Sequence, residues 1–157
     1  MPGLLCNVDK ENKIKHMNFL FSLAASFSVC ITAHATDWKG IAELSDQSGR
    51  TYLDVSSVVQ EGLYRKAWIM WDYVQLQHLN DSATAIYMSN KTLTYFDCNK
   101  RKVEYVQTSY FKVPHGDGSP VASPSRQFDP ADLANVVSGS MDDIHLKFVC
   151  DISLKGP

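Results

Sequence analysis

Several features that would point to a function are scarce or absent in this sequence. Cysteine occurs only four times in 157 residues. The net charge is −2 at pH 7, so there is no basic excess that would favour nucleic acid as a partner. No glycine-rich loop of the kind that holds phosphate groups is present. These absences argue against nucleic-acid binding and against nucleotide binding.

Metal-binding and catalytic patterns are also missing. After residue 35 the only histidines are His78, His115 and His145, and no two of them have the i,i+4 spacing of a helical metal site. We therefore expect no metal and no cofactor. No serine lies in a nucleophile elbow, so we expect a protein that is not an enzyme. The alternative is a hydrolase that uses His115 and Asp117, although this Gly-rich and Pro-rich stretch suits a plain loop.

Long apolar runs are absent except near the N-terminus. Residues 19–31 form an apolar run that is too short to span a bilayer. Lysines precede it at positions 10, 13 and 15, and the small-x-small sequence Ala33-His34-Ala35 follows it. This order is typical of a secretory signal peptide. We predict that residues 1–35 are a signal peptide cleaved after Ala35, and that residues 36–157 form a single exported domain.

Three other interpretations of the N-terminus stay open. The apolar run could remain uncleaved as an anchor, although it is short for that role. Cys30 could carry a lipid, although Val29 and Phe27 match a lipobox poorly. Translation could also begin at Met17, which changes the leader but not the exported domain. The expected location is the periplasm or the outer cell surface.

Cleavage after Ala35 would remove two of the four cysteines and leave Cys98 and Cys150. Two cysteines in an oxidising compartment are most simply a disulfide. The bridge would also leave no free thiol to act as a nucleophile.

Alternating apolar and polar residues predict mainly strands in the first part of the domain. The expected strands are residues 38–44, 51–54, 63–74, 84–98 and 102–113, and residues 75–82 are expected to form a loop. Residues 55–59 are expected to leave the sheet as one helical turn capped by Asp54 or Ser56. Both faces of residues 63–74 carry large apolar groups, so this strand should be central or covered on both sides.

The remainder of the chain predicts short helices. Residues 121–128 read as a strand broken by Pro124, and Pro130 can begin a short helix within residues 129–135. Ser140 and Asp143 resemble a capping box that begins a terminal helix. We therefore predict an α+β fold, an antiparallel meander sheet of about six strands with a short C-terminal helix pinned by one disulfide, Cys98–Cys150.

Several short segments together are similar to the surface-adhesin protein E family of Gram-negative bacteria. They are Trp38, the Tyr52-x-Asp54-x-Ser56-Ser57 segment, the strand with Trp68 and Trp71, Phe96-Asp97-Cys98 before a basic turn, Gly139-Ser140, and Val149-Cys150. The chain departs from the family's usual pattern at Ser138, where a proline is usual, and near Phe128, where a tryptophan is usual.

The resemblance implies a sheet of about six strands, one disulfide between Cys98 and Cys150, and adhesion to host matrix and serum proteins. Because the sequence also lacks a convincing catalytic constellation, we expect non-enzymatic recognition of a host matrix or envelope protein, or of a polyanion. The alternative is a periplasmic inhibitor or accessory protein that never reaches the surface.

Two groups of side chains are candidates for binding. The basic turn Lys100-Arg101-Lys102, extended by Arg65 and Lys66, could bind a polyanion, or its charges could simply protect a hairpin from edge pairing. The chain also has many aromatic residues between positions 64 and 111. If part of this set faces outward, it would form an aromatic patch of the kind that binds proteins or glycans.

Overall fold

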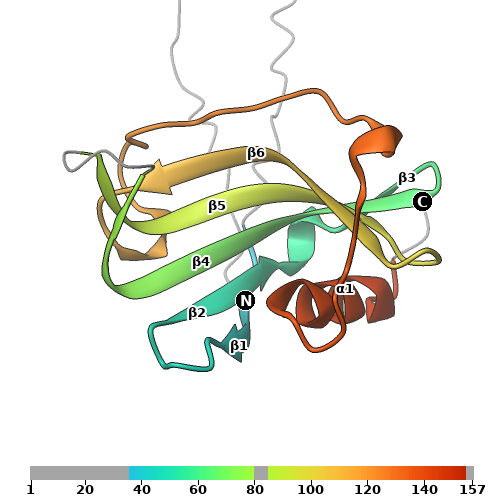
Figure 1. Cartoon of the computed structure of the whole chain (residues 1–157), viewed down its shortest axis with the longest axis horizontal. Coiled ribbons are helices and arrows are strands. Elements are labelled where there is room, and N and C mark those ends of the chain that lie inside the picture. Colours follow the sequence, from blue (N-terminus) through green and yellow to red (C-terminus); the bar gives the residue numbers. More distant parts are fainter. Residues whose placement is uncertain (1–35, 80–84, 155–157) are drawn as a thin grey trace, which may run out of the picture. The chain divides into compact units, whose positions relative to one another are not determined.

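The computed structural model describes residues 36–79 and 85–154. The predicted signal peptide, residues 1–35, lies outside the described residues. The described part forms an antiparallel sheet and a C-terminal helix, which confirms the predicted α+β fold (Figure 1). The elements are β1 (Trp38–Glu43), β2 (Gly49–Asp54), β3 (Val59–Glu61), β4 (Tyr64–His78), β5 (Ile86–Asp97), β6 (Lys102–Phe111), β7 (Ala134–Asn135) and α1 (Met141–Asp151).

The strands follow one another across the sheet almost in chain order. The order is β1-β2-β4-β5-β6-β7, and the short strand β3 pairs with the beginning of β4. All of these pairs are antiparallel. The predicted meander of about six strands is therefore confirmed. The sheet has seven strands because the short strands β3 and β7 join it.

Three side chains cap turns or the helix, and Asp54 and Ser140 are the two that the sequence predicted. Asp54 Oδ1 accepts a hydrogen bond from the Ser56 N–H (3.1 Å) and caps the 3₁₀ turn Val55–Ser57. Asp129 accepts from the Ala131 N–H (2.9 Å) at the turn Pro130–Asp132. Ser140 Oγ accepts from the Asp143 N–H (3.3 Å) at the start of α1. Each side chain satisfies a donor that the turn or helix leaves unpaired.

Two segments differ from the prediction. Residues 75–78 were expected to be a loop, but they extend β4, and Gln77 pairs with Tyr87 after a register shift. Residues 121–128 were expected to be a broken strand, but they form only two isolated bridges with β6, Gln107–Ser125 and Tyr110–Ala122. Proline at 124 has no N–H for a continuous ladder, which explains the second difference.

Helix α1 packs on one face of the sheet, and the core lies between them. Leu53, Ile69 and Phe96 on the sheet pack with Leu146 and Val149 on α1, and all five are almost fully buried. Burial of each such side chain stabilises the fold by about 1.5–3 kcal/mol. The predicted disulfide is present: Cys98 at the end of β5 is bonded to Cys150 near the end of α1.

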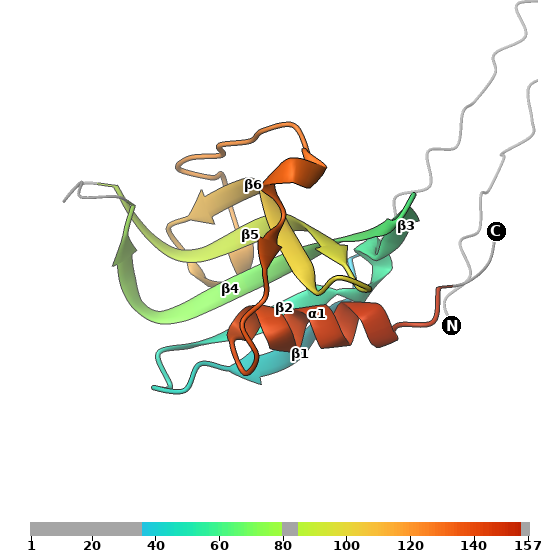
Figure 2. The same ribbon diagram turned by 45° about the vertical axis from the view of Figure 1, so that its right-hand side comes forward.

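The other face of the sheet is covered by the segment that follows β6. Phe128 stacks on Tyr95 with ring centroids 4.0 Å apart, and Lys91 Nζ donates to the Gly116 carbonyl oxygen (2.9 Å). Figure 2 shows this segment and α1 on opposite sides of the sheet. Strand β4 is therefore covered on both faces over part of its length, as its sequence predicted.

Helix α1 is only 11 residues long. Within residues 36–79 and 85–154, no helix is long and apolar enough to cross a membrane.

Candidate functional site

The predicted basic turn lies at the β5–β6 hairpin, beside the disulfide. Asp97 holds the turn, because its Oδ1 accepts from the backbone N–H groups of Asn99 (3.1 Å) and Lys100 (2.9 Å). Arg101 has a left-handed backbone with φ 54°, which the tight turn requires. Lys100 is exposed, and Lys102 is half-buried where β6 begins.

The Arg101 side chain contributes to the attachment of α1. Its guanidinium pairs with the buried carboxylate of Asp143, in the first turn of α1. Asp143 also accepts from the Gly139 N–H (2.8 Å) and from Lys147 Nζ (3.0 Å). The Gly139 amide, Arg101 and Lys147 hold the pKa of the Asp143 carboxyl far below its ordinary value.

Arg65 and Lys66, the other two predicted binding residues, occupy opposite faces of β4. The Arg65 guanidinium donates to the carbonyl oxygens of Val149 (2.5 Å) and Ile152 (2.7 Å) at the C-terminal end of α1. Lys66 pairs with Glu61 of β3, and Tyr95 donates its hydroxyl hydrogen to the same carboxylate (3.0 Å). The Glu61 carboxylate holds the pKa of Lys66 above its ordinary value.

The fold thus brings the five basic residues to one end of the sheet but not into one surface patch. The Arg65, Lys66 and Arg101 side chains have internal partners. Among the described residues, Lys100 and Lys102 form no ion pair.

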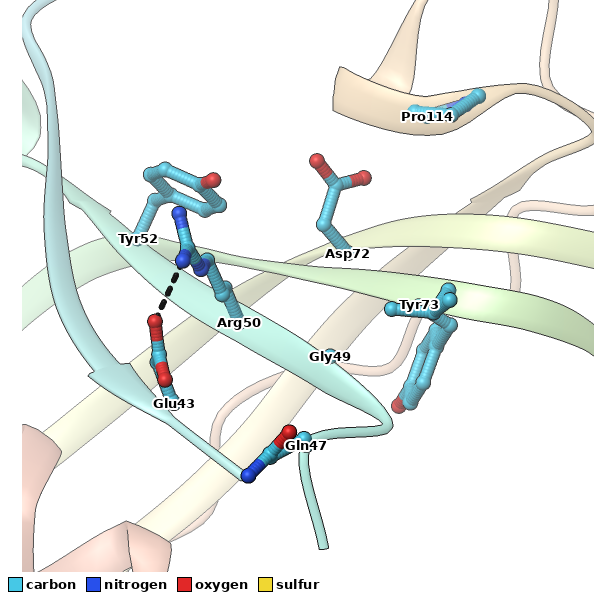
Figure 3. Close-up of a pocket in the computed structure, with 9 residues that line it drawn as sticks. Glu43, Gln47, Gly49, Arg50, Tyr52, Asp72, Tyr73 and Pro114 are labelled. Carbon is cyan, nitrogen blue, oxygen red and sulfur yellow. Dashed lines mark ion pairs between the residues drawn. The ribbon is translucent and has the colours of Figure 1, made fainter. Parts of the chain in front are cut away.

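A polar pocket of about 380 Å³ lies at the beginning of β2, where β1, β2 and β4 meet (Figure 3). Arg50 of β2 pairs with Glu43 of β1 (2.5 Å), and Tyr52 and Asp72 point into the same space. Gly49 allows the strands to approach here, because a Cβ at this position would lie 2.2 Å from the Asp72 carbonyl oxygen.

Asp72 anchors the turn Pro114–Gly116 beside this pocket. Its carboxylate accepts from the His115 backbone N–H (2.7 Å) and from His115 Nδ1 (2.6 Å). Asp72 is almost buried, whereas His115 is largely exposed and has a left-handed backbone with φ 61°. The same turn is tied to Ser89, whose Oγ accepts from the Gly116 N–H (2.9 Å) and donates to the Val113 carbonyl oxygen (2.6 Å).

This geometry gives His115 a different partner from the one that the catalytic alternative names. The carboxylate partner of His115 is Asp72, not Asp117. The neighbouring Ser89 hydroxyl is directed at backbone groups. A nucleophilic mechanism needs a hydroxyl or thiol within hydrogen-bond reach of the base. In the described part of the chain, no serine or cysteine side chain is hydrogen-bonded to His115. The Asp72–His115 pair fixes a turn.

Sequence reasoning missed this pocket. The available signal was Asp72 itself, a carboxylate between Trp71 and Tyr73 in a strand with apolar groups on both faces. Its partner His115 comes from another element, and Arg50 lies directly opposite Asp72 on β2, so this arrangement depends on tertiary contacts and strand register.

The aromatic residues divide between the two faces of the sheet. Tyr64 and Tyr95 pack against Phe128 on the face opposite α1. On the face that α1 occupies, Trp71, Tyr87, Tyr105 and Tyr110 line a depression of about 210 Å³, which we call the aromatic trough. Asn90, Thr92 and Thr108 complete its lining.

The described residues contain no group of three His, Cys, Asp or Glu side chains that could hold a metal ion.

Comparisons with known proteins show what the chain is similar to. The family model described as Surface-adhesin protein E matches residues 38–151. The structure of Haemophilus influenzae protein E is similar, with a TM-score of 0.53 and 14% identity over 75% of this chain and 89% of that chain. Its selenomethionine form gives a TM-score of 0.51 and 12% identity over 75% and 92% of the two chains.

A second crystal form of that protein gives a TM-score of 0.52 and 11% identity, covering 75% of this chain and 93% of the other. At such identities the structural likeness shows a shared fold. No curated protein matches the chain in sequence. The family match extends over most of the described residues and includes both cysteines of the disulfide. The chain therefore belongs to the surface-adhesin protein E family.

Proposed function

We propose that this chain is an exported, adhesin-like binding protein of the Gram-negative envelope that recognises a host matrix or envelope protein, or a polyanion, without catalysis. The family match over residues 38–151 carries the proposal. The Cys98–Cys150 disulfide supports export, because such bonds persist in oxidising compartments and are rare in the cytosol.

The absence of catalysis is supported by the role of the one histidine–carboxylate pair described above. Asp72 is engaged by the backbone and the ring of His115, so its carboxylate holds a turn in place. The family is one of surface adhesins rather than of enzymes.

The β5–β6 hairpin is our proposed contact for an acidic partner. Arg65, Lys66 and Arg101 have internal partners, so they position the hairpin and the surrounding surface. Lys100 and Lys102 would supply the positive charges that meet the partner. Attraction of this kind is screened by salt, so binding should weaken as ionic strength rises.

Heparin is a suitable probe for this hairpin. The double variant Lys100→Glu and Lys102→Glu should elute from immobilised heparin at clearly lower salt than the unmodified protein. Lys39→Glu is the control, because Lys39 is exposed like Lys100 but lies on β1, where it pairs with Asp37. Equal elution of the double variant and the unmodified protein would contradict the proposed contact.

Surface exposure needs a separate test on cells. Protease treatment of intact bacteria should degrade an adhesin displayed at the surface and spare a periplasmic control protein. Protection of this chain until the outer membrane is opened would instead identify it as a periplasmic accessory protein.

A further inference from the structure

The aromatic trough results from the position of α1 on the sheet. Cross-strand rows of side chains run over β4, β5 and β6, and α1 covers the part of this face that includes Ala67, Ile69 and Phe96. The rows Ile69–Thr92–Thr108 and Trp71–Asn90–Tyr110 extend toward the far end of the strands. Both views show that α1 ends before these strands do (Figures 1 and 2). The trough lies beside α1, over β5, β6 and Trp71 of β4.

The walls of the trough are aromatic and are held in place by one another. Tyr87 packs edge-to-face against Tyr110 (ring centroids 4.9 Å apart) and against Tyr73 (5.8 Å). Trp71 is fixed by an edge-to-face contact with His145 of α1 (5.3 Å), and Tyr105 donates its hydroxyl hydrogen to Asp142 of α1. A preformed wall of this kind binds a ligand without paying to order its side chains.

The polar part of the lining consists of an amide and two hydroxyl groups. Thr92 Oγ1 lies 3.2 Å from Asn90 Oδ1 and 3.3 Å from Thr108 Oγ1, so these hydrogen bonds are long. An amide and a hydroxyl can each donate and accept, so this surface has hydrogen-bonding capacity left for a ligand. Within the described residues, no charged side chain lines the trough.

We propose that the aromatic trough binds a neutral saccharide, one sugar ring at a time. The face of an aromatic ring is electron-rich and attracts the weakly positive C–H groups on the face of a sugar ring. The ring's hydroxyl groups match the Asn90, Thr92 and Thr108 side chains. An anionic ligand would find no cation in the lining, and a purely apolar peptide side chain would leave the polar groups unpaired.

The size of the trough supports a single ring. Its volume of about 210 Å³ is below the roughly 300–1,000 Å³ of sites that enclose a drug-sized ligand. The trough is also open to solvent, so a longer glycan could continue beyond the bound ring. This inference is independent of the proposed role of the β5–β6 hairpin, because the two sites share no residue.

Saturation-transfer NMR on the purified protein tests this proposal with four neutral disaccharides: chitobiose, lactose, maltose and mannobiose. At least one of them should receive saturation and bind in a titration. Tyr110→Ala should weaken that binding about tenfold or more, because it removes a wall of the trough. Thr108→Val, which keeps the side-chain shape and removes a hydroxyl, should also weaken it.

Two control variants separate local from global effects. Tyr64→Ala makes the same change as Tyr110→Ala on the opposite face of the sheet and should leave binding unchanged. Lys100→Glu with Lys102→Glu should also leave it unchanged, so failure of the hairpin proposal can be told from failure of this one. Circular dichroism melts establish that each variant is folded.

Binding of none of the four sugars would overturn the proposal, as would equal loss in Tyr64→Ala and Tyr110→Ala. A third contrary result is capture of an uncharged proline-rich peptide, strengthened by Thr108→Val, in place of any sugar. That outcome would identify the trough as a site for a peptide side chain.

Discussion

His145 is a residue whose protonation state is set by its place in the fold. It lies on α1 against the Trp71 ring and is almost fully buried, and its Nε2 has no hydrogen-bond partner. Burial disfavours the charged form and lowers the pKa of His145 to about 4, against a smaller opposing effect of the nearby Asp142 carboxylate. His145 is therefore neutral in the folded protein at physiological pH.

This predicts a specific pH dependence of stability. In the unfolded chain His145 has an ordinary pKa near 6.5, so between pH 6.5 and 4 the unfolded state binds the extra proton. The stabilisation is present above pH 6.5 and is lost as pH falls toward 4, by up to about 3 kcal/mol. His145→Leu removes this dependence, so its free energy of unfolding should change less with pH. Urea denaturation of both proteins at pH 7, 5.5 and 4.5 measures these free energies.

His78→Gln is the matched control, because His78 is exposed on β4. It should leave the pH profile almost unchanged. A free-energy difference between the unmodified protein and His145→Leu that stays constant from pH 7 to 4.5 would contradict the explanation.

For single residues, the sequence predicts local contacts well and distant contacts poorly. Asp54 and Ser140 could be assigned as caps because each bonds a backbone group two or three residues away. His145 and Asp72 could not be assigned, because their surroundings come from residues far along the chain. The pairing of Arg101 with buried Asp143, 42 positions later, could not be predicted for the same reason.

Three kinds of contact attach helix α1 to the sheet. Leu146 and Val149 pack into the core, Arg65 bonds the last carbonyl groups of the helix, and Cys150 is bonded to Cys98. The first turn is held separately by the Asp143–Arg101 pair. Because α1 borders the aromatic trough through Trp71 and Tyr105, loss of this attachment would also disturb the trough.

Removal of the disulfide should destabilise the protein strongly. Cys98 and Cys150 are 52 positions apart, and closing a loop of that size is worth about 4 kcal/mol in the chain-entropy model. The double variant Cys98→Ser and Cys150→Ser should lower the denaturant midpoint accordingly. When a reductant is present, the unmodified protein should unfold at the same denaturant midpoint as this double variant.

The double variant provides its own control, since reductant should not change its midpoint. A reductant-insensitive midpoint in the unmodified protein would show that the bridge contributes little to stability.

The elements that could be predicted are those whose residues alternate clearly. The long strands and the terminal helix follow their apolar patterns. The sequence of β3 and β7 is too short to show a pattern, and these strands exist because β4 and β6 offer unpaired edges. Residues 75–78 are polar and resemble a loop, but pairing with β5 makes them strand.

At the scale of the whole molecule, the sheet separates two surfaces. One carries α1 and the aromatic trough, and the other carries the segment after β6 and the polar pocket with Asp72. The sequence indicated the family, the disulfide and an outward-facing aromatic group. It could not say which aromatic residues face outward, because that depends on which rows of the sheet α1 covers.

The proposed function requires that this chain is exported and that its binding domain is disulfide-bonded. We would test both by intact mass spectrometry of the protein from the envelope fraction, after alkylation with and without reduction. We expect a chain that begins at Thr36 and gains two alkyl groups only after reduction. An uncleaved chain whose thiols are alkylated without reduction would contradict export and the adhesin-like function proposed from it.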